Sequence, residues 1–407
     1  MLCCLAEASP KIDRHPLPTR HLAAAAINNA IHPASDRLNL DVNMDVLDKA
    51  RILADAGRFD SCGPASCEVR ISPGLGGIHN VRARNQNCKI FKTLMDNNCS
   101  FDCKYCPNSN RCAKQKAKYA PNELASLFNH LHRTHGVQGL FLSSAVAGEP
   151  DRAATRMIEA VRLLRMQYEF SGYVHLKVLP GMSQDLIKQA AELADRMSIN
   201  IEAPTQSVLS ELSSCKTLKS DIIRRQRWVS KLDLPSGQTT QMIVGSFASD
   251  EESLRTAWKE YTRIGLKRVY YSAFTPVRGT AMQDAEAEDP RREHRLYNTD
   301  FLLREYGIKL KELLGIMDAG MLPHEDPKLV LARQTFSGPV DINQSSYEEL
   351  IRVPGIGPVT AKRIMAVTAA GSVANHEQLA MLGANLSKAS PFVTVQGKRQ
   401  SRIAEFA

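Results

Sequence analysis

The sequence lacks a long uncharged apolar run, and none approaches the roughly 18 to 20 residues that a membrane-spanning helix needs. Ten cysteines among 407 residues are too few for a secreted disulfide scaffold. The first residues, MLCCLAEASPK, include an acid and lack a basic lead-in, and the apolar run LAAAAI at 22–27 is too short for a signal peptide. We therefore expect a soluble protein of a reducing, cytoplasmic compartment that has no contact with a membrane.

Neither disorder nor a fibrous structure fits the composition, which is 43% hydrophobic and 23% charged. At roughly 100 to 200 residues per domain, a chain of this length predicts two or three domains. The formal net charge is +9, and acidic residues are scarce between positions 70 and 118, where ten Lys or Arg face only Asp96 and Asp102. Two interpretations stay open for this window: a solvated basic face, and an electrostatic footprint for phosphates.

Short apolar runs alternate with amphipathic stretches from Lys89 onward. The predicted strands are 89–95, 138–144, 172–179, 196–203, 239–246 and 266–274. The predicted helices are 121–135, 151–167, 183–194, one or more within 206–233, and 250–264. Six such units predict an α/β fold with a parallel sheet, and right-handed crossovers favour a partial (β/α)6 barrel over an open doubly wound sheet. In both architectures ligands bind beyond the carboxyl ends of the strands.

Four segments follow from these patterns. We expect a loop-rich N-terminal extension with one helix near 44–57 (1–88), the barrel (89–280), a helical extension and linker (281–339), and a small all-α module (340–407). Within the first segment, the Gly- and Pro-containing stretch 71–80 predicts a loop. Within the third, 296–318 is expected to be helical.

Three cysteines, Cys99, Cys103 and Cys106, follow the first predicted strand with CxxxCxxC spacing and Tyr105 before the last. A structural zinc site normally takes four protein ligands, whereas a [4Fe-4S] cluster held by three cysteines leaves one iron with an open coordination position. Cys112 is the candidate for a fourth ligand, which would make the site a closed, structural one. The spacing itself leaves both arrangements open.

This motif and the following strand and helix units resemble the radical S-adenosylmethionine (radical SAM) superfamily. The resemblance implies that Cys99, Cys103 and Cys106 hold a [4Fe-4S] cluster, that S-adenosylmethionine binds the open iron, and that its reductive cleavage produces a 5′-deoxyadenosyl radical. It also implies that Tyr105 packs near the adenine. In this family a Gly-Gly-Glu-like turn holds the methionine amino group, and Gly148 and Glu149 occupy that position here, with Ala147 replacing one glycine. An exposed glutamate at the entry of a helix is the alternative for Glu149.

Three further residues are candidates for the cofactor site. Asn200 and Glu202 alternate with apolar neighbours after the fourth strand, so we expect both to face the barrel interior, as ribose ligands or as a structural hydrogen-bond network. Gly245 permits close approach of a ligand to the backbone, or is a plain turn glycine.

Weaker candidates surround this set. His175, Lys177 and Tyr271 are possible substrate-orienting or radical-quenching residues, although a satisfied buried histidine is the more common arrangement. Cys62, Cys67 and Cys88 are candidate ligands of an auxiliary cluster, or else buried or incidental thiols.

The sequence RVPGIGP near position 355 resembles the helix-hairpin-helix motif of DNA-binding and repair proteins. Gly355 and Gly357 would let backbone N–H groups approach a phosphate, and Lys362 and Arg363 add positive charge. The alternative is a helical hairpin used only for packing or for contact with a protein.

Most of the chain resembles the DNA modification or repair proteins of the radical SAM superfamily. The shared stretches are LMDNNCSFDCKYC, GYVHLKVLPG, SINIEAPT, TTQMIVG, LKRVYYSAFTPV and RVPGIG. The resemblance implies DNA as partner, a low-potential electron donor of the flavodoxin or ferredoxin type, and association with a uracil-DNA-glycosylase-like protein. The alternatives are the same radical chemistry on RNA or a protein, and a metal-stabilised nucleic-acid-binding protein without catalytic turnover.

Overall fold

The computed structural model describes residues 44–60, 76–83 and 86–399. Its main sheet contains seven strands, which lie side by side in the order of the chain. These strands are β1 (Ile78–Ala83), β2 (Gln86–Leu94), β3 (Gly139–Ser143), β4 (Tyr173–Lys177), β5 (Arg196–Ser198), β6 (Gln238–Val244) and β7 (Arg268–Ala273). The pairs β2–β3, β3–β4, β4–β5 and β6–β7 are parallel, whereas β1 and β2 form an antiparallel pair.

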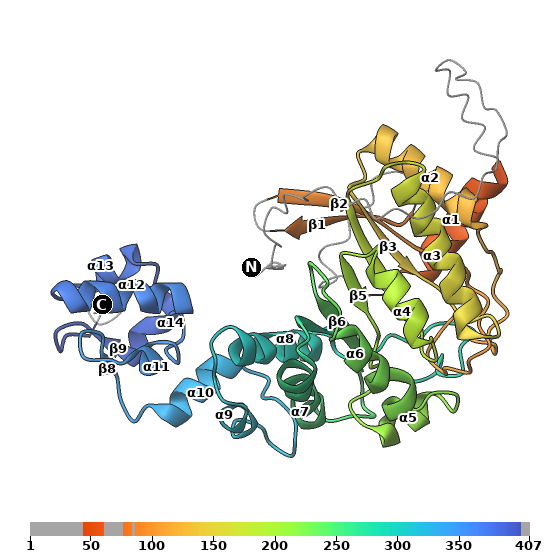
Figure 1. Cartoon of the computed structure of the whole chain (residues 1–407). Helices are drawn as coiled ribbons and strands as arrows, with labels where there is room; N and C mark the ends of the chain where they lie inside the picture. Colours follow the sequence, from red (N-terminus) through yellow and green to blue (C-terminus); the bar gives the residue numbers. More distant parts are fainter. Residues whose placement is uncertain (1–43, 61–75, 84–85, 400–407) are drawn as a thin grey trace. The chain divides into compact units, whose positions relative to one another are not determined.

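Helices follow the parallel strands, as the sequence predicts (Figure 1). They are α2 (Pro121–His135), α3 (Pro150–Met166), α4 (Gln184–Ala191), α5 (Gln206–Leu212), α6 (Arg224–Val229) and α7 (Asp250–Lys259). A doubly wound sheet reverses its strand order at a switch point, and this sheet does not, so the partial (β/α)6 barrel is confirmed. Within the described residues, no helix combines the length and the apolar character that crossing a membrane would require.

Two local predictions in the sheet were wrong. Residues 78–80, expected to be loop, belong to β1, and the close approach of this strand depends on Gly77 (φ +89°), where a Cβ would lie 2.7 Å from the Lys92 carbonyl oxygen. The expected strand at 196–203 ends at Ser198. There the hydroxyl of Thr240 donates to the Ile199 carbonyl at 2.7 Å and accepts from the Ile201 N–H at 2.9 Å. A side chain thus takes the place of the backbone-to-backbone hydrogen bonds that a strand would form here.

The chain divides into two compact units. In the first (up to 101, 108–198 and 231–238), β3 is buried along its whole length and α2 adds Leu124, Leu127 and Phe128 to the core. In the second (102–107, 199–230 and 239 onward), β6 is buried throughout. Each leucine or phenylalanine removed from water contributes about 1.5–3 kcal/mol to folding. An additional helix, α1 (Met44–Ala56), precedes the sheet, as predicted.

The remainder of the second unit is mostly helical. It contains α8 (Pro290–Arg304), α9 (Leu310–Leu314), α10 (Pro327–Thr335), α11 (Tyr347–Leu350), α12 (Pro358–Ala370), α13 (His376–Met381) and α14 (Leu386–Ala389). The helix expected at 296–318 is therefore divided in two, and the expected linker contains α10. A capping box begins α11, where Ser346 accepts from the Glu349 N–H and Glu349 caps in return. Two short parallel strands, β8 (Val340–Asp341) and β9 (Val393–Thr394), add a small sheet that was not predicted.

Candidate functional site

The loop after β2 carries the three cysteines, and its first part is held by backbone contacts within the first unit. The Ser100 N–H donates to the Val146 carbonyl at 2.7 Å, and the Gly148 N–H donates to the Ser100 hydroxyl at 2.7 Å. Cys99 is partly buried immediately before Ser100. The structure thus brings the predicted Gly148 turn next to the first cysteine, and Glu149 is exposed at the N-cap of α3.

The second part of the loop is held by Asp102 within the second unit. Its carboxylate accepts from the hydroxyls of Ser213 at 2.8 Å and Ser214 at 2.6 Å and from the Ser214 N–H at 3.1 Å. Burial opposes the charge, but these bonds and one from Cys215 hold the pKa of Asp102 well below its usual range. Asp102 therefore stays ionised and fastens the loop to the end of α5. Sequence reasoning missed this clasp, because a Ser-Ser pair after a helix carries no specific signal.

A buried lysine, Lys216, lies beside Cys103 and Cys106. Cys103 donates to the Ser213 hydroxyl oxygen at 3.6 Å. Lys216 is only 8% exposed, and its Nζ lies 3.5 Å from Oε1 of Glu202. Burial lowers the pKa of Lys216, but Cys103, Glu202 and Cys106 outweigh it and raise the pKa above its usual value. Lys216, another residue that sequence reasoning missed, is thus a buried cation beside two of the three motif cysteines.

Tyr105 and Glu202 complete this group. Lys216 donates to the Tyr105 hydroxyl at 3.4 Å, and burial followed by the charge of Glu202 raises the pKa of Tyr105 well above its usual value. Glu202 has a left-handed backbone (φ +63°), which costs a non-glycine residue about 1–2 kcal/mol. Hydrogen bonds to the Gln241 carbonyl (3.0 Å) and from the Ile243 N–H (2.8 Å) hold it there.

Asn200 is partly buried in the same segment, between Ile199 and Ile201. Both isoleucines are fully buried, as the predicted alternation requires. The left-handed residue that follows this alternation could not be predicted from it.

His175 and Lys177, the interior candidates of β4, have partners within the first unit. The His175 Nε2 lies 2.7 Å from the Ser198 hydroxyl, and burial, with Arg196 and Lys177, lowers the pKa of His175 well below its usual value. The imidazole is therefore neutral at pH 7. Lys177 forms an ion pair with Asp60.

Tyr271 and Gly245 have structural contacts in the second unit. Tyr271 is fully buried, its hydroxyl donates to Asp300 of α8 at 3.5 Å, and burial raises its pKa well above the usual value. A Cβ at Gly245 would lie 2.4 Å from the Phe247 ring, and the Gly245 carbonyl accepts from Arg292 at 3.0 Å. Both residues thus have structural partners within the second unit.

The remaining cysteines are arranged differently. The hydroxyl of Ser109 donates to the buried Cys112 sulfur at 3.7 Å. Cys88 is partly buried on β2, and burial raises its pKa, while Cys62 and Cys67 lie outside the described residues. Over the described ranges, no three His, Cys, Asp or Glu residues are grouped so as to hold a single metal ion. The donor set of the motif, three thiols within eight residues of chain, suits a cluster that binds each thiolate at a separate iron.

The hairpin between α11 and α12 forms as predicted, but each of its glycines has an internal neighbour. Gly355 has φ +82°, and a Cβ there would lie 2.4 Å from the Asn385 carbonyl oxygen. A Cβ at Gly357 would lie 3.2 Å from the Tyr306 hydroxyl. Lys362 and Arg363 are exposed on α12, as a phosphate-binding surface would need. Both glycines thus lie at close internal contacts, and the basic side chains of α12 remain accessible.

Comparison with known proteins identifies the C-terminal module most directly. A family model described as the helix-hairpin-helix motif matches residues 336–383. No curated protein matches the chain.

Several solved structures resemble this chain. Methylornithine synthase has 12% identity and a TM-score of 0.42, covering 52% of this chain and 62% of its own. The FeFe-hydrogenase maturase HydG from Carboxydothermus hydrogenoformans has 10% identity and a TM-score of 0.44, covering 53% and 51%. A radical SAM methyltransferase from Sphaerobacter thermophilus has 12% identity and a TM-score of 0.40, covering 54% and 64%. The match spans less than two thirds of each of these proteins. Because the identities and TM-scores are low, our assignment of the fold rests on the strand order of the chain itself.

Proposed function

We propose that this chain is a radical SAM enzyme in which Cys99, Cys103 and Cys106 hold a [4Fe-4S] cluster. The observation that carries the proposal is the three-cysteine loop at the carboxyl end of the first parallel strand, with the buried Lys216 beside two of the thiols. When bound, the cluster supplies the electron that cleaves S-adenosylmethionine to a 5′-deoxyadenosyl radical.

The residues around the loop have separate tasks in this proposal. Asp102 fixes the loop backbone, and Lys216 compensates the negative charge of the thiolates and of Glu202. The turn at Gly148 and the polar groups of Asn200 and Glu202 orient the cofactor. Neutral His175 supplies a hydrogen-bonding group that carries no positive charge at pH 7.

We further propose that the substrate is DNA. The match of residues 336–383 to the helix-hairpin-helix motif supports this proposal, because that motif suits backbone N–H contacts to phosphates. Lys362 and Arg363 are the exposed cations that would add sequence-independent affinity. A low-potential flavodoxin or ferredoxin and a uracil-DNA-glycosylase-like protein are the proposed partners.

Anaerobic reconstitution tests the cluster. We expect the wild-type protein to show iron–sulfur absorption and to form 5′-deoxyadenosine from S-adenosylmethionine with dithionite. Cys99→Ala, Cys103→Ala and Cys106→Ala should each abolish product formation, while Cys88→Ala, which changes a thiol on β2 outside the loop, should not. Cys112→Ala distinguishes the closed site, since loss of the cluster in that variant as well as in the three motif variants would contradict a three-cysteine site.

Binding to labelled oligonucleotides tests the substrate class. Lys362→Ala combined with Arg363→Ala should weaken duplex DNA binding and lower the magnitude of its salt slope by about 1 to 2. Lys309→Ala combined with Lys311→Ala removes two exposed cations outside the hairpin and serves as the control. Unchanged DNA binding in the hairpin variant, or preferential binding to RNA, would contradict the assignment.

A further inference from the structure

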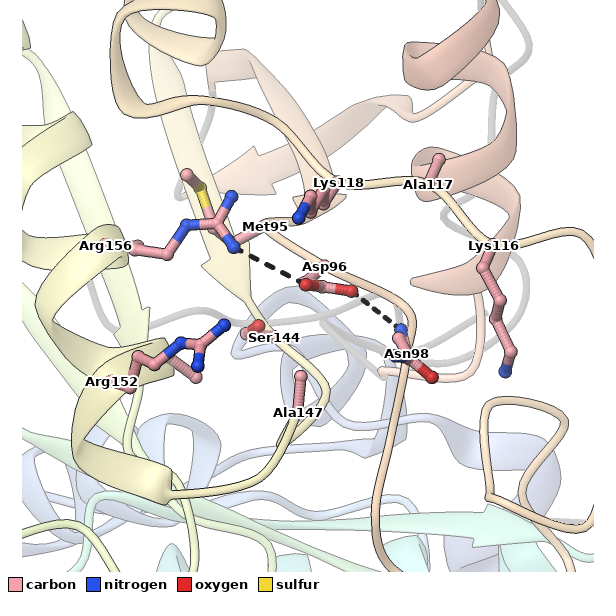
Figure 2. Close-up of a pocket in the computed structure, with 11 residues that line it drawn as sticks. Met95, Asp96, Asn98, Lys116, Ala117, Lys118, Ser144, Ala147, Arg152 and Arg156 are labelled. Atoms are coloured by element: carbon pink, nitrogen blue, oxygen red, sulfur yellow. Dashed lines mark hydrogen bonds and ion pairs between the residues drawn. The ribbon is translucent and has the colours of Figure 1, made fainter.

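A cavity of about 290 Å³ lies beside the cysteine loop, wholly within the first unit. It is bounded by the end of β2, the segment 116–118 and the first two turns of α3. Figure 2 shows Arg152 and Arg156 extending from α3 toward Ser144 and Asp96. Asn98, which precedes Cys99, also lines it, so the cavity adjoins the candidate active site.

The charges around this cavity do not balance. Four cations line it, namely Lys116, Lys118, Arg152 and Arg156, against the single carboxylate of Asp96. Like charges held around one concave space repel each other unless an anion lies among them.

The single carboxylate, that of Asp96, already has hydrogen-bond and ion-pair partners. Asp96 is 5% exposed, pairs with Arg156 at 3.5 Å and accepts from the Asn98 N–H at 2.8 Å. Arg156 also donates to the Tyr119 carbonyl, so its guanidinium is fixed in place.

The other three cations are exposed and form no ion pair with a described carboxylate. Among the described residues, Lys116 donates to the carbonyls of Asn97 and Asn108, both at 3.3 Å. Lys118 and Arg152 form no ion pair with a carboxylate in the part of the chain that the structure describes. The N-terminal end of α3 adds the positive end of its helix dipole. Together these groups give the cavity an excess of positive charge.

We propose that this cavity binds a phosphate group, supplied either by a nucleic-acid strand or by a phosphorylated small molecule. A guanidinium matches the oxygens of a phosphate in a bidentate way, and lysines add point charge. The volume is near the lower end of small-molecule pockets, which suits one phosphate with its attached sugar. Where the source is the strand, the inference rests on the proposed DNA substrate and places a strand phosphate next to the cysteine loop.

Arg152→Ala combined with Lys118→Ala tests the site, because neither side chain takes part in a described ion pair. Arg162→Ala combined with Lys188→Ala removes two exposed cations from the outer faces of α3 and α4 and is the matched control. Calorimetry with inorganic pyrophosphate should show at least a tenfold loss of affinity in the pocket variant and no loss in the control. Thermal unfolding checks that both variants are folded.

A second measurement identifies the source of the phosphate. If it is a nucleic-acid strand, the salt slope for a short single-stranded oligodeoxynucleotide should fall in magnitude by about 1 in the pocket variant. If pyrophosphate affinity falls and the slope does not, the ligand is a phosphorylated small molecule.

Unchanged affinity of the pocket variant for both probes would overturn the inference. If the only change in this variant is slower reduction of the protein by a flavodoxin-type donor, the cations instead form a binding surface for an acidic protein, which also overturns it. The proposed function is judged separately, by 5′-deoxyadenosine formation in the wild-type protein, which uses neither probe.

Discussion

Gly355→Ala should destabilise the helix-hairpin-helix module rather than simply remove a phosphate contact. Gly355 has φ +82°, and a Cβ would lie 2.4 Å from the carbonyl oxygen of Asn385, a backbone atom that cannot turn aside. The Asn385 N–H also donates to the Gly355 carbonyl at 2.9 Å, so the two segments cannot separate without losing this bond.

The structure gives the size of the effect. A left-handed backbone costs alanine about 1–2 kcal/mol, and relieving the clash adds about 1–3 kcal/mol. The sum, about 2–5 kcal/mol, is comparable with the total stability of a module of this size, which is roughly 3–9 kcal/mol. We therefore expect the equilibrium constant for unfolding of the module to rise about 30- to 4,000-fold, since each 1.4 kcal/mol is about a factor of ten.

Hydrogen exchange on the full chain measures this directly. In Gly355→Ala the amides of α11 and α12 should lose protection, whereas those of β3 and α3 should keep it. Gly338→Ala is the control, because a Cβ there meets nothing within 4 Å and the backbone is not left-handed. Equal protection of α12 in the two variants would refute the packing argument.

Two further substitutions probe the second unit. Asp102→Asn removes the negative charge that accepts hydrogen bonds from Ser213 and Ser214. It should lower the unfolding free energy by about 2–3 kcal/mol and reduce the iron content after reconstitution. Full iron content with an unchanged melting temperature would contradict this role of Asp102. Burial raises the pKa of Glu260 from 4.5 to about 7, so between these pH values the folded state holds a proton that the unfolded state releases. The stability contributed by the protonated carboxyl is complete below pH 4.5 and is lost as the pH rises through 7. Glu260→Gln should therefore raise unfolding free energy relative to wild type by up to about 3 kcal/mol at pH 8 and by less at pH 5 in urea titrations, and an equal change at both pH values would contradict the buried acid.

Local patterns predicted most of the fold because they act over short stretches of chain. Helix α2 was predicted with the bounds that the structure has, and α3 to within one residue at each end. The errors arose where a distant group replaced a local one. Thr240 ends β5 early, and Gly77 allows β1 to pair where a loop was expected.

The candidate site also contains residues that the sequence predicted and residues that it did not. Cys99, Cys103 and Cys106 are recognisable because three thiols lie within eight residues of chain. Lys216 is more than a hundred residues away from them and carries no motif, so its place beside the thiols could not be predicted.

The sequence by itself determined the alternation of strands and helices, the three-cysteine loop and the helical hairpin, because each depends on residues close together in the chain. The tertiary structure decided the left-handed Glu202, the packing of Gly355 against Asn385, and the gathering of Lys118, Arg152 and Arg156 around one cavity. The physical reason is that a buried charge or a close backbone contact depends on its neighbours in space, and folding alone brings those neighbours together.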